Sequence, residues 1–206
     1  MVVASFTGAA GAVAAGDDGS VVALLAGQAG FWTVLVAVVI FDGSQAPGGE
    51  PAKPLARTVR WFDIPVGAMV GAATQFVLLP LLYLPFRGFF DEDDLSAPAE
   101  DLLSGLTGGG LVAMGLGVVV VAPVVEELFF RGLLLEAMRY RWNTTVAVAA
   151  SSVVFGATHF QPLQFAGLTL AGLVFAGAVV RTGRIGSAIC VHAGFNAATF
   201  AILTVL

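Results

Sequence analysis

The chain has 206 residues, of which 58% are hydrophobic and only 11% are charged, and its mean hydropathy is +0.93. Soluble domains are about 25% charged, so this composition excludes an ordinary soluble globule, and the abundance of apolar residues excludes a disordered chain. The net charge of −5 argues against nucleic acid as a partner, because phosphate binding requires a basic surface. The chain is therefore expected to be an integral membrane protein that contacts the lipid bilayer.

Apolar runs recur along the chain, and a transmembrane helix needs about 20 such residues. Six runs are expected to form helices: 21–41, 64–86, 104–138, 145–160, 163–180 and 185–206. The run 104–138 is too long for one straight span, so we expect Pro123 to break or kink it. A further apolar stretch at residues 2–16 is compatible with one more span or with a disordered leader. The prediction is an all-α polytopic membrane helix bundle of six to eight transmembrane helices, forming one membrane domain.

The basic residues indicate how this bundle is oriented. If each run crosses once, seven of the nine Lys and Arg residues fall on one side. The positive-inside rule assigns that side to the cytoplasm. The seven are Lys53, Arg57, Arg60, Arg139, Arg141, Arg181 and Arg184.

Gly67 and Gly71 lie one helical turn apart in the run 64–86, and Ala72 and Ala73 follow them. Small residues at this spacing let two membrane helices approach closely. We expect this face to pack against another helix.

Ionisable side chains inside membrane spans are costly and indicate function. Both histidines of the chain, His159 and His192, fall within apolar runs. Glu127 and Arg131 lie four residues apart, and so on one helix face, which predicts a buried ion pair. Glu126 points about 100° away from Glu127, so we expect its carboxylate to remain free for chemistry.

Two further pairs share a helix face, Phe155 with His159 and His192 with Asn196. A carboxylate and an imidazole that hold one water form a general-base arrangement for hydrolysis. An imidazole and an amide that both donate hydrogen bonds suit the oxyanion of a tetrahedral intermediate. The predicted reaction is hydrolysis of an amide bond within or next to the membrane.

Other functions are compatible with the same residues. Two histidines and one glutamate are the ligand set of some zinc hydrolases, although no His-Glu-x-x-His occurs and we expect neither a metal nor another cofactor. The ionisable groups could also form a structural ion network, or a proton relay in a transporter. An immunity or scaffold protein without catalysis is the remaining alternative.

Three motifs follow one another on successive predicted spans: Glu126-Glu127-x-x-x-Arg131, Phe155-x-x-x-His159 and His192-x-x-x-Asn196. In this order they resemble the CPBP family of intramembrane glutamic endopeptidases, which are related to type II CAAX prenyl proteases and to bacteriocin self-immunity proteins. The resemblance covers residues 102–206, as a CAAX-protease-like catalytic core. Residues 1–101 would supply N-terminal membrane helices and loops.

The resemblance implies a role for each motif residue: Glu126 and His159 activate the attacking water, His192 and Asn196 form the oxyanion hole, and Glu127 with Arg131 supports the site. It implies a membrane-associated peptide or protein as substrate, with C-terminal CAAX-type processing as one form of the reaction. It also implies an integral membrane location, which we expect to be a prokaryotic cell membrane.

Overall fold

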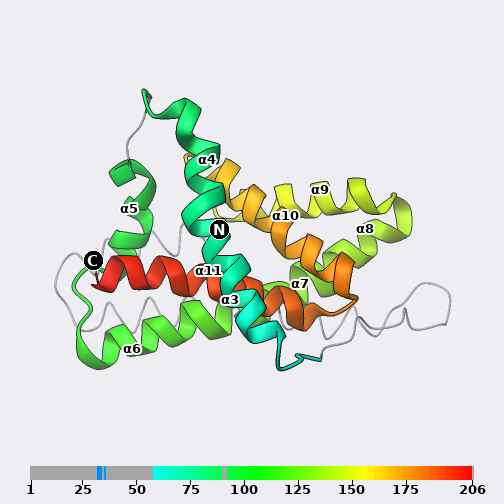
Figure 1. The fold of residues 1–206 in the computed structure, drawn as a ribbon, viewed down its shortest axis with the longest axis horizontal. Helices are drawn as coiled ribbons and strands as arrows, with labels where there is room; N and C mark the ends of the chain where they lie inside the picture. Colours follow the sequence, from blue (N-terminus) through cyan, green and yellow to red (C-terminus); the bar gives the residue numbers. More distant parts are fainter. Residues whose placement is uncertain (1–31, 34, 36–57, 90–91, 206) are drawn as a thin grey trace.

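The computed structural model describes residues 32–33, 35, 58–89 and 92–205, which are largely helical and contain no β-strand (Figure 1). The all-α prediction is therefore confirmed for the part of the chain that the structure describes. The stretch at 2–16 and nearly all of the run at 21–41 lie outside the described residues.

The first described helices run without interruption up to residue 86, and a separate helix follows. They are α3 (Asp63–Ala73), the π-helical segment η1 (Thr74–Leu78), α4 (Leu79–Tyr83), the 3₁₀ segment η2 (Leu84–Phe86) and α5 (Glu92–Leu103).

A second continuous helical stretch carries the first motif. Three more helices come after it: the second motif lies at the end of the first of them, and the third motif lies on the last. The segments of the continuous stretch are α6 (Gly108–Leu116), η3 (Gly117–Val121), α7 (Ala122–Phe129), η4 (Phe130–Leu134) and α8 (Leu135–Arg141), where η3 and η4 are π-helical. The three later helices are α9 (Thr144–Thr158), α10 (Phe165–Thr182) and α11 (Ile185–Val205).

Four of the described helical stretches are long and apolar enough to cross a membrane: Asp63–Phe86, Gly108–Arg141, Phe165–Thr182 and Ile185–Thr204. Helix α9 is apolar as well, but its 15 residues fall short of a bilayer. The prediction of a polytopic membrane bundle is confirmed. The described residues supply four of the six to eight predicted spans.

The sequence left open whether Pro123 breaks or kinks the long helix, and the structure shows that the helix is not broken there. The helix continues from η3 into α7, and the N–H of Ala122 donates to the carbonyl of Gly117, five residues earlier. Proline lacks an N–H and its ring clashes with the carbonyl four residues before it. The wider π turn directly ahead of Pro123 accommodates the ring, so the helix does not end there.

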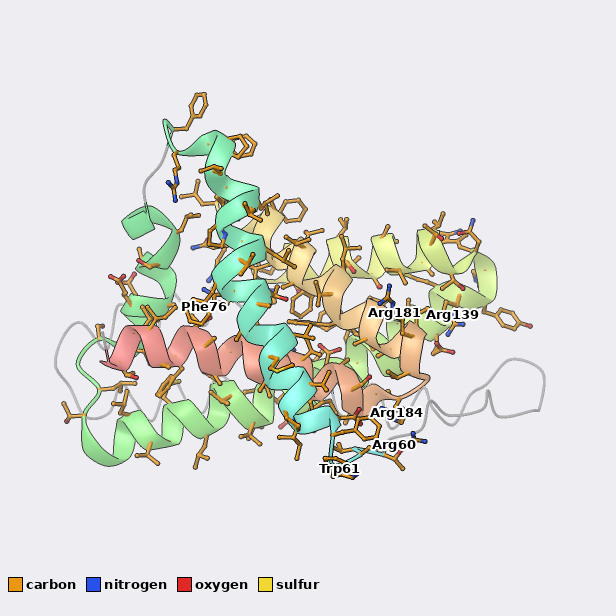
Figure 2. All side chains as sticks on the ribbon, in the orientation of Figure 1. Arg60, Trp61, Phe76, Arg139, Arg181 and Arg184 are labelled. Carbon is orange, nitrogen blue, oxygen red and sulfur yellow. The ribbon has the colours of Figure 1, made fainter. Side chains whose placement is uncertain are left out.

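The outer surfaces of the bundle are apolar, as lipid contact requires. Large hydrophobic side chains stand exposed along the first and second helical stretches, and Phe76 is labelled among them in Figure 2. On a soluble protein an apolar surface of this extent would signal an interface; here it faces hydrocarbon. Examples are Ile64, Met69, Phe76, Leu81, Val112 and Leu116.

Four arginines mark one end of the described helices. Arg139 and Arg181 lie in the last turns of α8 and α10, and Arg184 lies just before α11. Arg60 precedes α3 beside Trp61, a residue that is 82% exposed, as in aromatic belts at membrane interfaces (Figure 2). This distribution agrees with the predicted cytoplasmic side; Lys53 and Arg57 lie outside the described residues.

Helix α3 packs against α11 with the two backbones in contact (Figure 1). A Cβ atom added to Gly71 would lie 2.3 Å from the backbone nitrogen of Phe195, and one on Gly67 would lie 2.5 Å from Cys190 Cβ. On the other side, a Cβ on Gly194 would lie 2.6 Å from Ala68 Cα. The predicted small-residue face is confirmed, and its partner is the helix that carries the third motif.

Gly71→Ala is expected to destabilise the bundle, because its new methyl group has no room against the α11 backbone. Overpacking of a tight contact costs about 1–3 kcal/mol. The matched control is Gly177→Ala on α10, where no heavy atom lies within 4 Å of the added Cβ. Thermal unfolding in detergent measures both variants. A Gly71→Ala protein that melts at the same temperature as Gly177→Ala would contradict the close contact.

Candidate active site

A fully buried ion pair forms the base of the site. Arg131 Nη1 donates to Glu127 Oε1 at 2.9 Å, and both side chains are 0% exposed. The guanidinium reaches a third helix as well, because its Nη2 donates to the carbonyl of Gly172 in α10 at 2.8 Å. The ion pair predicted from the spacing is therefore confirmed, and it also ties η4 to α10.

Aromatic rings enclose the charge of Arg131. Its guanidinium carbon lies 4.7 Å from the ring centre of Phe155, 5.4 Å from that of Phe175 and 5.8 Å from that of Phe130. Ring faces attract a cation, and a desolvated cation is attracted more strongly. The Glu127 carboxylate supplies the full counter-charge that a buried guanidinium requires.

His192 binds the same carboxylate from the opposite helix. Its Nδ1 lies 2.9 Å from Glu127 Oε1, and its ring stacks on Phe175 at 4.4 Å with an interplanar angle of 18°. An ionised carboxylate only accepts hydrogen bonds, so Nδ1 carries the proton. Nothing in the sequence marks Phe175, because an aromatic residue in an apolar helix is ordinary; its role is visible only in the fold.

Glu126 has a different environment from the residue beside it. Its side chain is 11% exposed, whereas that of Glu127 is 0% exposed. Its Oε2 lies 4.0 Å from His192 Nε2, beyond hydrogen-bond distance, and none of the described residues donates a hydrogen bond to it. The expectation that Arg131 pairs with Glu127 is confirmed, and the charged group that Glu126 approaches is His192 at 4.0 Å.

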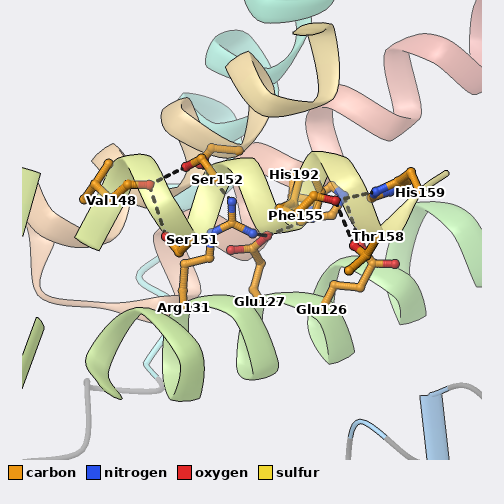
Figure 3. Close-up of polar contacts among 11 residues, drawn as sticks. Glu126, Glu127, Arg131, Val148, Ser151, Ser152, Phe155, Thr158, His159 and His192 are labelled. Atoms are coloured by element: carbon orange, nitrogen blue, oxygen red, sulfur yellow. Dashed lines mark hydrogen bonds and ion pairs between the residues drawn. The ribbon is translucent and has the colours of Figure 1, made fainter. Parts of the chain in front are cut away.

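His159 lies directly after α9 and connects to the cluster through one aromatic ring. Its Nδ1 lies 2.8 Å from the carbonyl of Phe155, and its ring centre lies 4.8 Å from the ring centre of Phe155. The Phe155 ring is in turn 5.7 Å from that of His192. Figure 3 shows His159 and Glu126 at one end of this row of side chains, with Arg131 at the other. Because a carbonyl only accepts, Nδ1 of His159 carries the proton and Nε2 is left as an acceptor.

Asn196 does not share an acceptor with His192. Its Nδ2 donates to the backbone carbonyl of Val118 in η3 at 2.8 Å, whereas His192 Nδ1 bonds to Glu127. The two polar groups expected at one point are thus each held by a separate partner. One N–H of Asn196 and Nε2 of His192 remain for a ligand.

The described residues contain no group of three or more His, Cys, Asp and Glu side chains arranged to hold a metal ion. The single cysteine lies elsewhere: Cys190 packs against Gly67 of α3. Direct contacts therefore join Glu126, Glu127, Arg131 and His192, while His159 and Asn196 are attached through Phe155 and η3.

Arg131→Met is expected to destabilise the protein strongly, because it leaves the Glu127 carboxylate buried without its counter-charge. Removing one partner of a buried ion pair costs about 3–5 kcal/mol. The control on the same stretch is Arg139→Met, whose pair with Glu136 at 2.7 Å is partly exposed; such pairs contribute about 0–1 kcal/mol. Unfolding of each variant in SDS-containing micelles measures the difference. Equal stability of the two variants would show that Arg131 does not neutralise Glu127.

The segment that carries these residues matches a known family. Residues 108–198 match the family model described as type II CAAX prenyl endopeptidase Rce1-like, a range that includes all six residues predicted for the site. No curated protein and no solved structure matches the chain. The resemblance inferred from the three motifs is confirmed at family level. The matched family is one of membrane proteases. Residues 108–198 of the chain are thus similar to the Rce1-like family of type II CAAX prenyl endopeptidases.

Proposed function

We propose that this protein is an intramembrane endopeptidase in which the Glu126 carboxylate removes a proton from the attacking water. The observation that supports this role is the contrast between two adjacent glutamates. Glu127 is completely enclosed and bonded to Arg131 and His192, whereas Glu126 is partly exposed and takes no hydrogen bond from the described residues. A general base needs a free carboxylate that a water can reach.

His159 is the second group for this water. Its Nδ1–H is occupied by the carbonyl of Phe155, so its Nε2 lone pair is the atom available to the substrate side. A water between Glu126 and His159 would donate one hydrogen bond to each. Loss of its proton to Glu126 leaves the hydroxide that adds to the scissile carbonyl carbon.

His192 and Asn196 would bind the oxyanion that this addition creates. The second N–H of the Asn196 amide is one donor. For His192 to donate from Nε2, its ring must be doubly protonated, with Glu127 as the counter-ion at Nδ1. Collapse of the tetrahedral intermediate breaks the C–N bond, and the proton held by Glu126 passes to the leaving amine.

The substrate must reach a site inside the bilayer. Glu126 lies near the middle of the helical stretch Gly108–Arg141, which is long enough to cross the membrane. A lipid at the C-terminus of a peptide anchors that peptide to the bilayer and so brings it next to the site. The Rce1-like match supports such a CAAX-type substrate. The proposed reaction is endoproteolytic removal of residues that follow a lipidated cysteine.

Glu126→Gln is expected to lower kcat/KM for a prenylated CAAX peptide by about 10²–10⁴, the usual contribution of general-base catalysis. The glutamine keeps the volume of the side chain but binds no proton. Glu136→Gln is the matched control, because Glu136 lies on the same helical stretch and, among the described residues, pairs with the partly exposed Arg139. Peptide cleavage by the detergent-purified protein measures both, with an unmodified membrane-proximal peptide and a chelator as further arms.

Each result of this assay separates two functions. Cleavage that survives the chelator and disappears in Glu126→Gln supports the glutamate-dependent peptidase. Cleavage abolished by the chelator would replace it with a metal-dependent protease. A folded wild-type protein that cleaves neither peptide would favour a non-enzymatic immunity, scaffold or transport protein.

A further inference from the structure

The carbonyl of Val118 is left outside the backbone hydrogen-bond ladder of its own helix. In a regular α-helix the N–H of Ala122 would donate to it, but that N–H donates to Gly117 instead. In the π pattern that Ala122 follows, the next N–H would come from residue 123, which is proline. Neither helical pattern therefore supplies a backbone donor to Val118.

The side chain of Asn196 satisfies this carbonyl. Helix α11 packs against η3, and Asn196 Nδ2 lies 2.8 Å from the Val118 oxygen. A carbonyl within a membrane span needs a partner, because lipid tails offer it no hydrogen-bond donor. This bond fixes the amide plane of Asn196, since one of its two N–H groups is committed to the backbone.

We propose that Pro123 is a positioning residue of the active site, which orients Asn196 by withholding a backbone donor from the carbonyl of Val118. The freed carbonyl takes one N–H of Asn196 and thereby fixes the direction of the other N–H. The catalytic part of this inference rests on the proposed function, in which that second N–H binds the oxyanion. The hydrogen-bond part does not depend on activity.

The same chain contains a matched arrangement away from the site. Segment η1 is also followed by a proline at the second position, Pro80, and the N–H of Leu79 donates five residues back to Thr74. Pro80 is exposed, and the stretch Asp63–Phe86 carries none of the six site residues. Pro80→Ala therefore restores a backbone N–H directly after a π-helical turn without touching the site, at an exposed proline where Pro123 is a buried one.

A direct measurement of the Asn196–Val118 contact tests the hydrogen-bond part. The chain has two asparagines, Asn143 and Asn196. Asn143→Ser removes the other one and keeps a residue that caps α9, since the Asn143 side chain accepts from the N–H of Val146. Asparagine labelled with ¹⁵N in the side-chain amide and valine labelled with ¹³C at the carbonyl then report one contact by solid-state NMR in liposomes. We expect a strong dipolar coupling in this background and its loss on adding Pro123→Ala.

Kinetics test the catalytic part. Pro123→Ala is expected to lower kcat for peptide cleavage by about 10-fold to 100-fold. This loss does not exceed the loss of kcat that follows when an oxyanion donor is deleted outright. KM should stay within about twofold, because the interaction is made in the transition state. Pro123 is fully buried, so Pro123→Ala loses packing while it gains helix propensity, and thermal unfolding of the variant decides whether a fall in kcat is one of folding. Pro80→Ala should leave kcat and the NMR contact unchanged.

Three results would overturn the proposal or part of it. A dipolar contact that persists in Pro123→Ala would show that proline does not control the bond. A contact that is lost with no change in kcat would show that the orientation of Asn196 has no role in catalysis. An equal fall of kcat in Pro80→Ala would indicate a general effect of the π turns. If the wild type cleaves no peptide, the proposed function fails, yet the NMR contact still decides whether Pro123 orients Asn196.

Discussion

The arrangement of this bundle depends on one carboxylate with no access to water. Glu127 is 0% exposed, and a charge at that depth is tolerable only because Arg131 and His192 both bind its Oε1. These partners lie on η4 and α11, and Arg131 reaches α10 through Gly172. Satisfying one buried charge thus fixes three helical elements relative to α7, and Glu126 is placed at the same time because it is the adjacent residue.

The sequence predicted what depends on local spacing. Glu127 and Arg131 are four residues apart on one helix, so their pairing follows from helix geometry alone. The bond between Glu127 and His192 joins residues 65 positions apart, and only helix packing determines it. The acceptor of Asn196 was beyond prediction for a different reason: it is a backbone carbonyl, which every residue has, and no side-chain pattern distinguishes Val118 from its neighbours.

Pro123 shows that a correct rule predicts where a helix is disturbed but not how the helix responds. Proline does remove a hydrogen bond and does clash with the preceding turn. The helix responds by widening that turn instead of ending, and η1 ahead of Pro80 responds in the same way. The sequence identified where the backbone ladder is interrupted, whereas the structure shows how the interruption is accommodated and which side chain takes the freed carbonyl.

The contact between α3 and α11 has a consequence for biosynthesis. Helix α3 enters the membrane before α11, with its glycine face still waiting for the backbone of the later helix. Glu126, Arg131 and the α9 residue Phe155 are likewise translated before α11 delivers its histidine. During translation the carboxylates precede their partner His192. The proposed site is therefore complete only after helix α11 has entered the membrane.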